Sequence, residues 1–574
     1  MPDGAGGRRR PTWVVEVRVD GHPGPLVDAL ENDVLPRVLA GARWYGAKDA
    51  GPPHVRILDL IGFGPDGDVA VALLSATPPG RSAQTWVLPL AVEWGPAGQD
   101  PSVAAVTDGR RTGRLADAVA SGAFARAFLA TAARETADGL ALRRTGAPLD
   151  MAALAAAPVA VSGAEQSNSS IRFGDIAILK LFRRLEPGVH PEIEIGRFLT
   201  ETAGFDGAPP LLGWLELGGA EPVVAGSLVA VVAGARDGWA TATDLLRGPA
   251  GGPALAGLAR TLGRRTAAMH RAFAVPTGDP AFRADAATAA DLDAMASAAQ
   301  ADAGRVLDAL AARTDPDARR LVRRRDDLLA ALGAVRSRGG GAVRTRVHGD
   351  YHLGQVLVAA GGDVRIVDFE GEPMRPLAER RAKRIPLTDV AGMLRSFAYA
   401  AAAAGRDDDA GAAAAFLDAY RAEAGAAVDD ALLRFFVLER AVYEVGYEIA
   451  NRPDWVSIPV RGILALLGAA GGGDRGGARR GLHAGGHRPR GDRPPRPPRA
   501  DGDHGGAADA RRGRPGRAEP GQRRGRPLRT GREPSRHGRP ALHRAAPHAL
   551  GCRDRPRRSA GRDLLTVRAA ANPP

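Results

Sequence analysis

The chain has 574 residues, of which 44% are hydrophobic, so it is long enough for roughly two to four domains with buried cores. Its single cysteine, Cys552, excludes a framework of disulfides or zinc-bound thiolates and is typical of a reducing, cytoplasmic location. No run of about 18 uninterrupted apolar residues occurs, so we expect no association with a membrane through a spanning helix.

The net charge of +13 is concentrated at the C-terminal end. Residues 471–574 contain 26 arginines, no lysine and nine acidic residues, a net charge of +17, which leaves −4 for residues 1–470. The first 470 residues therefore give no reason to expect a nucleic-acid partner. Residues 471–574 also lack Phe, Trp and Tyr, so they cannot bury enough apolar surface and are predicted to form a disordered Arg/Gly/Pro-rich tail. Two alternatives are an RNA- or anion-binding role and a reading-frame artefact, since GC-rich codons read out of frame give this composition.

Strand-like and helical patterns alternate along the first 470 residues. Residues 12–95 contain short β-like runs separated by Gly/Pro turns, which predicts a small antiparallel layer. Alanine-rich helical spacing follows at 115–142, and strand-like runs return at 159–233. After Trp239 the pattern is helical almost throughout, except at 343–370, where two short strands carry acidic residues.

This order of elements predicts an α+β protein with a two-lobed, protein-kinase-like fold. We expect a first subdomain in residues 1–110, followed by an intermediate segment and the kinase N-lobe in 111–234. The helical C-lobe is expected in 235–470, before the tail.

The two acid-bearing strands inside the helical part carry the clearest chemical signal. In "RTRVHGDYHLGQVL", residues 344–357, Asp350 precedes Gln355 by five residues, as the base of a kinase catalytic loop precedes its amide metal ligand. Asp368 follows at the end of the second apolar run, in "VRIVDFEGEP", after a Gly turn that permits a hairpin. The ordered set predicts phosphoryl transfer, with Asp350 as the catalytic base and with Gln355 and Asp368 as ligands of Mg²⁺.

The segment before the helical lobe supplies a candidate cation for the nucleotide. Lys180 closes the apolar run "AILKLF" and is expected to reach the phosphates of ATP. Glu194 lies 14 residues further on and is expected to pair with it, with Glu192 as a close rival. The polar loop "GAEQSNSS" precedes this strand, and an ordinary hairpin is the alternative interpretation of its composition. Its residues expected to cover the phosphates are Ser167, Asn168 and Ser169.

Two histidines flank Asp350. His348 and His352 are four residues apart, which suggests a metal site, but no third ligand is evident nearby. We therefore expect His348 to brace the catalytic loop by hydrogen bonds, beside the bound acceptor.

Six stretches of the chain resemble the maltokinases of actinobacteria, relatives of the aminoglycoside phosphotransferases that share the eukaryotic-like kinase fold. They are "GAEQSNSS", "ILKLFRRLEPGVHPEIE", "LGRRTAAMHRA", "HGDYHLGQVL", "IVDFEGEPMRPLAERRAKRIPLTDVAGMLRSFAYA" and "ERAVYEVGYEIANRPDWVSIPVRGI". The resemblance, from about Arg43 to about Leu467, implies an N-terminal cap subdomain and ATP-dependent phosphorylation of maltose to maltose 1-phosphate. That product would feed α-glucan and glycogen synthesis from trehalose. An association with trehalose synthase is a possible partner interaction, and a monomer is favoured.

The resemblance also implies that the helical lobe binds the sugar, since its polar and aromatic side chains suit hydroxyl groups and a sugar ring. The residues assigned to the acceptor are His348, Asp389, Arg395, Glu439, Tyr443, Glu444, Tyr447 and Trp455. Alternatives are helix packing for Tyr443 and Tyr447, which share a helix face, and a salt bridge to an acid for Arg395.

The sequence departs from the maltokinase pattern in several places. Arg440 stands where a Lys is expected and Gly446 where a basic residue is expected. The segment between the lobes offers no side chain for adenine, so backbone groups of 229–234 are assigned to it. Alternative functions are an aminoglycoside or other small-molecule phosphotransferase and a non-catalytic kinase-fold partner of a trehalose or glucan enzyme. The intact set of Lys180, Asp350, Gln355 and Asp368 argues against the non-catalytic alternative.

Overall fold

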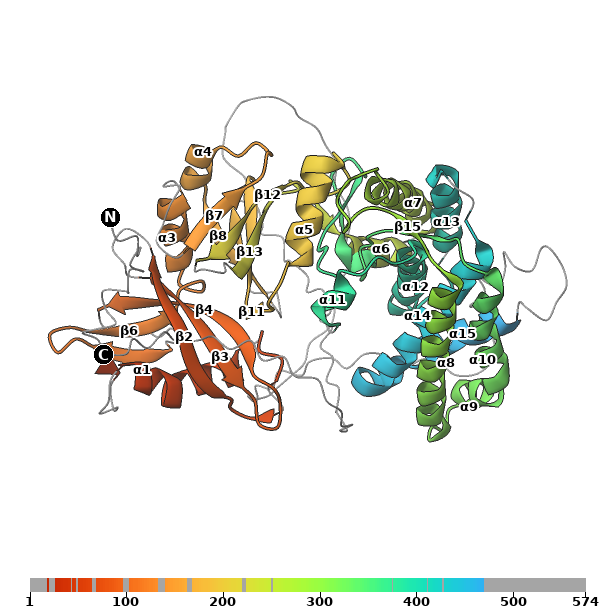
Figure 1. The fold of residues 1–574 in the computed structure, drawn as a ribbon, viewed down its shortest axis with the longest axis horizontal. Helices are drawn as coiled ribbons and strands as arrows, with labels where there is room; N and C mark the ends of the chain where they lie inside the picture. The colour runs from red at the N-terminus through yellow and green to blue at the C-terminus, as the bar shows by residue number, and fades with distance from the viewer. Residues whose placement is uncertain are drawn as a thin grey trace, which may run out of the picture. The chain divides into compact units, whose positions relative to one another are not determined.

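The computed structural model describes residues 18–19 and 26–468, with the exceptions of 43, 48–49, 64–68, 96–102, 133–139, 163–167, 219–222, 249–250, 374, 410 and 426–427. The predicted tail and Ser167 lie outside the described residues. Within them the two-lobed α+β fold predicted from the sequence is confirmed, since β-sheets precede a lobe built of helices (Figure 1). No helix in the described part of the chain is long and apolar enough to cross a membrane.

The first sheet is antiparallel, with the strand order β1-β5-β6-β4-β3-β2 and with β11 paired to β4. Its strands are β1 (Arg18–Val19), β2 (His54–Phe63), β3 (Val69–Thr77), β4 (Gln84–Trp94), β5 (Ala104–Thr107), β6 (Thr112–Asp117) and β11 (Arg184–Leu185). The short helices α1 (Leu26–Ala29), η2 (Leu30–Val34) and α2 (Leu35–Gly41) cover one face. Helix α3 (Ala123–Ala132) covers the other face, so the middle of β4 is buried on both sides. Because β6 belongs to it, this sheet extends past residue 110, where the first subdomain was expected to end.

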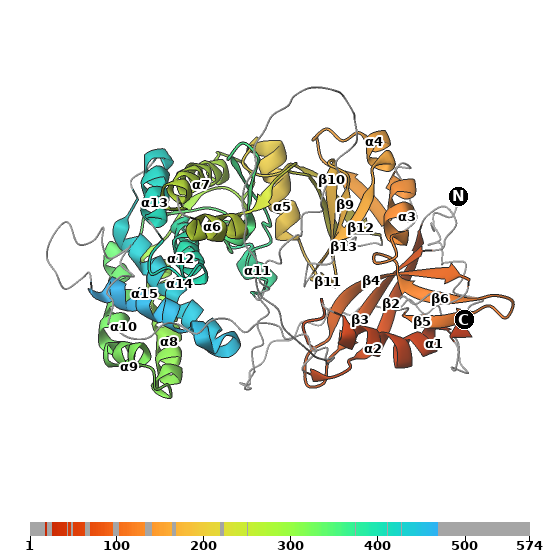
Figure 2. The same ribbon diagram turned by 180° about the vertical axis from the view of Figure 1, so that it is seen from behind.

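The second sheet is also antiparallel and has the order β7-β12-β13-β10-β9-β8 (Figure 2). Its strands are β7 (Leu140–Arg144), β8 (Val159–Ser162), β9 (Asn168–Phe173), β10 (Ala177–Phe182), β12 (Leu211–Leu217) and β13 (Val223–Ala230). Helix α4 (Met151–Ala156) precedes β8, and α5 (Pro191–Arg197) with η4 (Phe198–Thr202) follows β11. Helix α5 begins at a proline, which suits the first helical position because its missing N–H would have no partner there.

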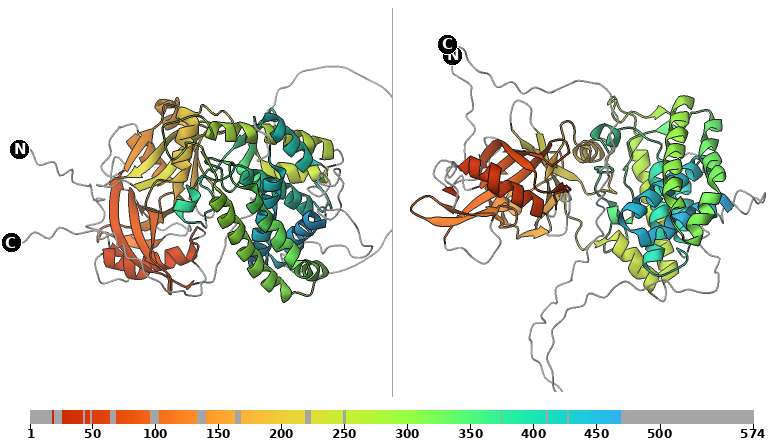
Figure 3. Two further views of the ribbon diagram at one scale, coloured as in Figure 1. Left: turned by 45° about the vertical axis from the view of Figure 1, so that its right-hand side comes forward. Right: turned by 90° about the horizontal axis from the view of Figure 1, so that it is seen from below.

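The helical lobe follows β13, as Figure 3 shows, and the buried side chains of its helices belong to one core cluster. Its helices are α6 (Gly238–Arg247), α7 (Gly251–Phe273), α8 (Ala289–Ala311), α9 (Pro316–Arg323), α10 (Arg325–Gly333), η5 (Ala334–Arg338), η6 (Leu353–Gln355), α11 (Leu377–Arg380), α12 (Leu387–Ala403), α13 (Ala412–Glu423), α14 (Asp430–Asn451), η7 (Pro453–Trp455) and α15 (Ser457–Gly468). Helices α7 and α13 approach closely at Gly263, where a Cβ atom would lie 2.2 Å from the carbonyl oxygen of Phe416.

Two small antiparallel sheets interrupt the helices. One joins β14 (Arg236–Asp237), β17 (Val356–Val358) and β18 (Val364–Ile366), and the other joins β15 (Asp285–Ala286) and β16 (Val343–Arg344). Strands β17 and β18 form the expected hairpin, with Val356 opposite Ile366. The hairpin therefore brings the loop before β17 and the residues after β18 to the same end, which places "HGDYHLGQ" beside "VDFEGE".

Candidate active site

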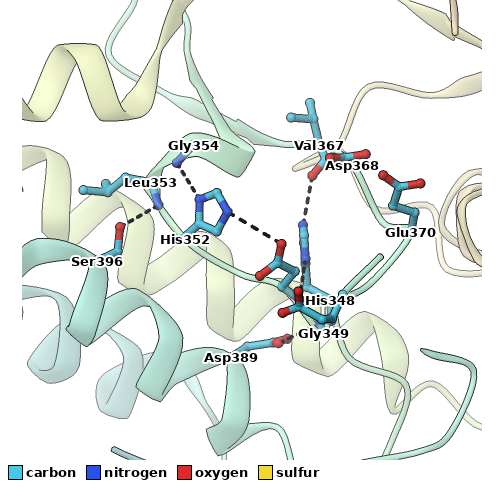
Figure 4. Close-up of polar contacts among 12 residues, drawn as sticks. His348, Gly349, His352, Leu353, Gly354, Val367, Asp368, Glu370, Asp389 and Ser396 are labelled. Carbon is cyan, nitrogen blue, oxygen red and sulfur yellow. Dashed lines mark hydrogen bonds and ion pairs between the residues drawn. The ribbon is translucent and has the colours of Figure 1, made fainter. Parts of the chain in front are cut away.

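The loop that carries Asp350 is held from two sides by hydrogen bonds (Figure 4). The backbone N–H groups of His348 and Gly349 donate to the carboxylate of Asp389 on α12, at 2.8 and 3.0 Å. The Nε2–H group of His348 donates to the carbonyl oxygen of Val367 at 2.9 Å, and the N–H of Leu353 donates to Ser396 Oγ at 3.0 Å. The loop is therefore fixed to α12 and to the end of β18.

His348 and Asp389 were expected to contact the acceptor, and the structure contradicts this. Both side chains are buried at 1% exposure and are engaged in holding the loop. Burial alone would raise the pKa of Asp389, but His270 at 3.2 Å and the loop N–H donors hold that pKa below its usual value. Asp389 therefore stays charged and accepts hydrogen bonds from the backbone of the loop. The bracing role expected for His348 agrees with its contacts.

The carboxylate of Asp350 lies next to a partly buried arginine, Arg440. Arg440 approaches Asp350 at 3.5 Å, Glu372 at 3.8 Å and Glu444 at 3.8 Å. Arg395 also pairs with Glu444, at 2.9 Å. We call these five residues the Arg440 cluster. Burial raises the pKa of Glu372, and the negative charge of Asp350 raises it further, against the opposing effect of Arg440.

Asp368 has a left-handed backbone, with φ of 68°, and no other non-glycine residue among those described has a positive φ. Asp and Asn tolerate this conformation better than most residues, at a cost on the order of 1 kcal/mol. The carboxylate of Asp368 accepts a hydrogen bond from the ammonium group of Lys180. Burial would raise the pKa of Asp368, but this ammonium outweighs it and holds the pKa below its usual value.

Lys180 pairs with Glu192 and not with Glu194, which corrects the expected pairing. The ammonium of Lys180 lies 2.9 Å from Glu192 Oε2, and the Oγ–H group of Ser227 donates to Glu192 Oε1 at 2.5 Å. Residues two apart on a helix point about 200° away from each other. Glu194 therefore faces the other side of α5, where it pairs with Arg346 and Arg381.

The polar loop before β9 lies only partly within the described residues. In the register of β9 and β10, Asn168 is opposite Phe182 and Ser170 is opposite Lys180, so both lie on the sheet face of Lys180. Ser169 points to the opposite face, where its hydroxyl accepts a hydrogen bond from Arg183 at 2.9 Å. Asn168 thus keeps a position suited to a nucleotide, whereas the Ser169 side chain does not.

The sequence analysis did not single out Glu370, which completes a group of three carboxylates. Oxygen atoms of Glu192, Asp368 and Glu370 lie within 4.8 Å of one another. Burial raises the pKa of Glu370, and the negative charges of Asp368 and Glu192 raise it further. The positive charge of Lys180 opposes this rise, and the resulting pKa is about 8. An acid two residues after Asp368, in "DFE", was the available signal.

The donors around Asp368 fit a magnesium ion. Mg²⁺ prefers oxygen ligands and usually takes one or two carboxylates together with phosphate oxygens. Asp368 and Glu370 offer carboxylates, and a hydrogen bond of 3.0 Å from Val367 N–H to the backbone C=O of Gln355 holds the Gln355 backbone to the residue before Asp368. We propose that Asp368, Glu370 and Gln355 hold Mg²⁺, which would offset the charge of the nucleotide phosphates.

We expect Glu370→Gln to weaken divalent-cation binding by about 10- to 100-fold. Because protons compete with the metal for Glu370, whose pKa is about 8, the affinity of the wild-type protein should rise between pH 6 and 8. The variant should lose most of this rise. Electron paramagnetic resonance of Mn²⁺ in the presence of ADP measures both effects. Equal affinity and equal pH dependence in the two proteins would exclude Glu370 as a ligand.

The remaining residues assigned to the acceptor divide into two groups. Tyr443 lies beside Arg440, whose guanidinium is 5.1 Å from its ring, and Glu444 belongs to the Arg440 cluster. Tyr447 and Trp455 lie further along, each in contact with the guanidinium of Arg452. The last two residues of the set are Glu439 and Arg395. Glu439 faces Arg384 at 3.9 Å. Arg395 forms a salt bridge with Glu444, which was the alternative interpretation of this residue. The sequence analysis missed Glu372, which lies next to Asp350 and follows it by 22 positions.

No family model matches the chain. It is 33% identical over 332 residues to a glucosamine kinase of Streptacidiphilus jiangxiensis, which covers 53% of this chain and 72% of that protein. It is 32% identical over 328 residues to a glucosamine kinase of Mycolicibacterium smegmatis, covering 53% and 78% of the two chains. Its structure resembles that of a glucosamine kinase in complex with glucosamine, ADP and inorganic phosphate, with a TM-score of 0.56, 26% identity and coverage of 78% and 100%.

Proposed function

Since the chain belongs to the glucosamine kinase family, we propose that it transfers the terminal phosphoryl group of ATP to glucosamine. The protein is an ATP-dependent sugar kinase. What we propose is the identity of its acceptor and the roles of individual residues.

The charge of the Arg440 cluster is the observation that carries the choice of an amino sugar. The cluster contains three carboxylates, Asp350, Glu372 and Glu444, and two guanidinium groups. A further guanidinium, that of Arg375, also acts on Glu372, but it is partly exposed and pairs with Glu379 at 3.3 Å. The contacts of Arg440 with its three acids are long, at 3.5 to 3.8 Å, and Glu372 is buried beside the like charge of Asp350. An ammonium group placed here would lower this repulsion, whereas the hydroxyl group of a neutral sugar would not.

The proposed chemistry assigns one task to each side of the site. Asp350 accepts the proton of the acceptor hydroxyl as that oxygen attacks the terminal phosphorus of ATP. Lys180, oriented by Glu192, neutralises charge on the nucleotide phosphates, and the bond from phosphorus to the bridging oxygen of ADP breaks. The backbone anchors from Asp389 and Val367 keep Asp350 in place during this transfer.

The packing beyond the cluster favours a single sugar ring. Tyr399 Oη donates to Glu448 at 3.0 Å, and Arg452 pairs with Glu448 at 2.6 Å. Trp455 stacks on Tyr399 with ring centroids 6.1 Å apart. Glu448 is 1% exposed, and Tyr399 and Tyr447 are each 9% exposed. Because these side chains bind mostly to one another, they offer little surface to a second sugar ring.

Maltose, its 1-phosphate and the link to trehalose synthase and glycogen were expected from the resemblance to maltokinases. The relatives named above are glucosamine kinases, so these finer expectations stay predictions without support from them. Maltose therefore belongs among the acceptors that are tested.

The proposal is tested by steady-state release of ADP with ATP, Mg²⁺ and one acceptor at a time. Glucosamine is compared with glucose, which has a hydroxyl in place of the amine, with N-acetylglucosamine, which removes the charge, and with maltose and kanamycin. We expect the highest kcat/KM with glucosamine. A higher value with glucose or maltose would refute the proposed acceptor, and a higher value with kanamycin would favour an aminoglycoside phosphotransferase.

We expect Glu372→Gln to reduce selectivity for the amine. A hydrogen bond to a charged group contributes about 1.5–3 kcal/mol, so kcat/KM for glucosamine should fall about 10- to 100-fold while that for glucose changes little. The matched control is Glu423→Gln, the same substitution in an exposed ion pair with Arg271 at the end of α13. Equal losses with both sugars would indicate that Glu372 does not contact the amine.

A further inference from the structure

A three-residue ion cluster, in which two members are buried and Arg381 is 33% exposed, lies on the side of α5 that faces away from Lys180. Glu194 accepts two hydrogen bonds from Arg381, from Nε at 3.0 Å and from Nη2 at 2.7 Å. Its second partner is Arg346, with Nη1 at 2.9 Å from Glu194 Oε2. The side chains of Arg346 and Glu194 are 1% and 11% exposed. Burial would raise the pKa of Glu194, but the two guanidinium groups hold that pKa below its usual value, so Glu194 is charged.

The three members of this cluster come from the three segments that carry the catalytic groups. Glu194 lies two residues after Glu192 on α5. Arg346 lies four residues before Asp350, on the chain that leads into the loop. Arg381 directly follows α11, on the segment that begins with Asp368 and Glu370. One carboxylate therefore joins the helix of Glu192 to the segments of both catalytic acids.

Neighbouring contacts make this junction rigid. Arg346 Nη1 also donates to the carbonyl oxygen of Arg381 at 2.8 Å, and the backbones of Thr345 and Arg384 pair in both directions, at 3.0 and 2.8 Å. Arg380, on the same turn, pairs with Glu186 and donates to the carbonyl oxygen of Glu370 at 3.3 Å. These contacts hold Arg346 and Arg381 to each other, so that Glu194 on α5 pairs with two partners that are fixed together.

The cluster is poorly suited to a role in stability alone. Burying charges costs desolvation energy that a salt bridge often does not recover, so a buried ion pair is weak evidence of net stabilisation. Arg346 Nη2 is buried with no hydrogen-bond partner among the described residues, which adds to that cost. The hydrogen bonds between these charged groups instead fix the orientation of α5 relative to the two segments.

We infer that Glu194 is a positioning residue, which holds α5 against Arg346 and Arg381 so that Glu192 on the opposite side keeps Lys180 directed at the nucleotide phosphates. Glu192 thus contacts the catalytic lysine from one side of α5, and Glu194 contacts the helical lobe from the other side. This role concerns the phosphoryl-transfer step and does not depend on which sugar is the acceptor.

The test is a double-mutant cycle of Glu192→Gln and Glu194→Gln, measured with saturating ATP and whichever sugar is the most active acceptor. A displacement of about 1 Å at a catalytic group costs up to about 100-fold, so we expect Glu194→Gln alone to lower kcat about 10- to 100-fold. If Glu194 acts through Glu192, the double variant should be no slower than Glu192→Gln alone. Losses that multiply in the double variant would overturn the inference.

Two further variants separate positioning from folding. Glu201→Gln removes an exposed ion pair with Arg197 from the same helical segment and is expected to leave kcat unchanged. Arg381→Gln keeps the pair of Glu194 with Arg346 but cuts the link to α11, and should lower kcat if Glu194→Gln does not fold. Thermal melting is recorded for each variant. Unchanged kcat in folded Glu194→Gln or Arg381→Gln, assayed well below the melting temperature, would contradict the proposed role.

Discussion

Replacement of Asp350 by Asn is expected to abolish most turnover while the protein still binds nucleotide. The amide has the size of the carboxylate but cannot accept the proton of the acceptor hydroxyl, and loss of a general base costs about 10²- to 10⁴-fold in kcat. The loop should keep its shape, because its anchors are the backbone bonds to Asp389 and the bond from His348 to Val367. Initial rates of ADP release, together with the Kd of ADP from calorimetry, measure the two parts of this prediction.

The control for Asp350→Asn is Asp317→Asn on helix α9, which removes one carboxylate from a partly exposed ion pair with Arg461. It should leave both kcat and nucleotide affinity unchanged. An Asp350→Asn variant with near-normal turnover would show that Asp350 is not the base, and a variant that had lost ADP binding would place its role on the nucleotide side.

Replacement of Asp368 by Asn is expected to have the second-largest effect. The carboxylate pairs with Lys180 and faces Glu370, so its removal takes away a proposed metal ligand and a partner of the catalytic lysine. Removing one preorganised electrostatic group costs about 10²- to 10³-fold in kcat. Because Asn adopts positive φ almost as readily as Asp, the backbone at this position should not change. The kcat at saturating ATP and a Mg²⁺ titration measure the loss.

Asp368→Ala separates the charge from the backbone. Alanine lacks the short polar side chain that makes φ of 68° tolerable, so it should lower the melting temperature in addition to kcat, whereas Asn should lower kcat alone. A normal kcat in the Asn variant would exclude Asp368 from the transfer step.

Spacing along the chain was sufficient to predict the centre of the site. The five-residue spacing from Asp350 to Gln355, and the Gly turn before Asp368, describe a loop and a hairpin whose register is local, so the sequence contains the geometry that brings them together. Lys180 was predicted from its place in an apolar run to reach the nucleotide phosphates, which stays a prediction, and the structure adds its contact with Asp368.

Predictions failed where they depended on the direction of a side chain. The choice between Glu192 and Glu194 requires the rotational phase of α5, and the short segment "PEIEIGR" does not reveal which face is turned toward Lys180. Ser169 and Asn168 are neighbours in sequence but lie on opposite faces of β9, which only the register with β10 decides. Asp389 was assigned to the sugar because an acid near the start of a helix looks the same whether it faces solvent or a loop backbone.

The acceptor side was the hardest to predict because its residues come from distant segments. Glu372, Arg395, Arg440 and Glu444 meet only through tertiary packing of α12 and α14 with the segment after Asp368. From sequence, maltose was expected as the acceptor only through the resemblance to maltokinases. In the structure these two acids and two arginines pair with one another, and Asp350 adds a third carboxylate to the cluster.

Preference for an amino sugar over a neutral one can be measured in a single competition experiment. The protein is incubated with ATP, Mg²⁺ and equal concentrations of glucosamine, glucose, N-acetylglucosamine and maltose, and the phosphorylated products are identified by mass spectrometry, with NMR to locate the phosphate. We expect glucosamine phosphate as the main product. Maltose phosphate as the main product, with the phosphate on the anomeric carbon, would contradict it.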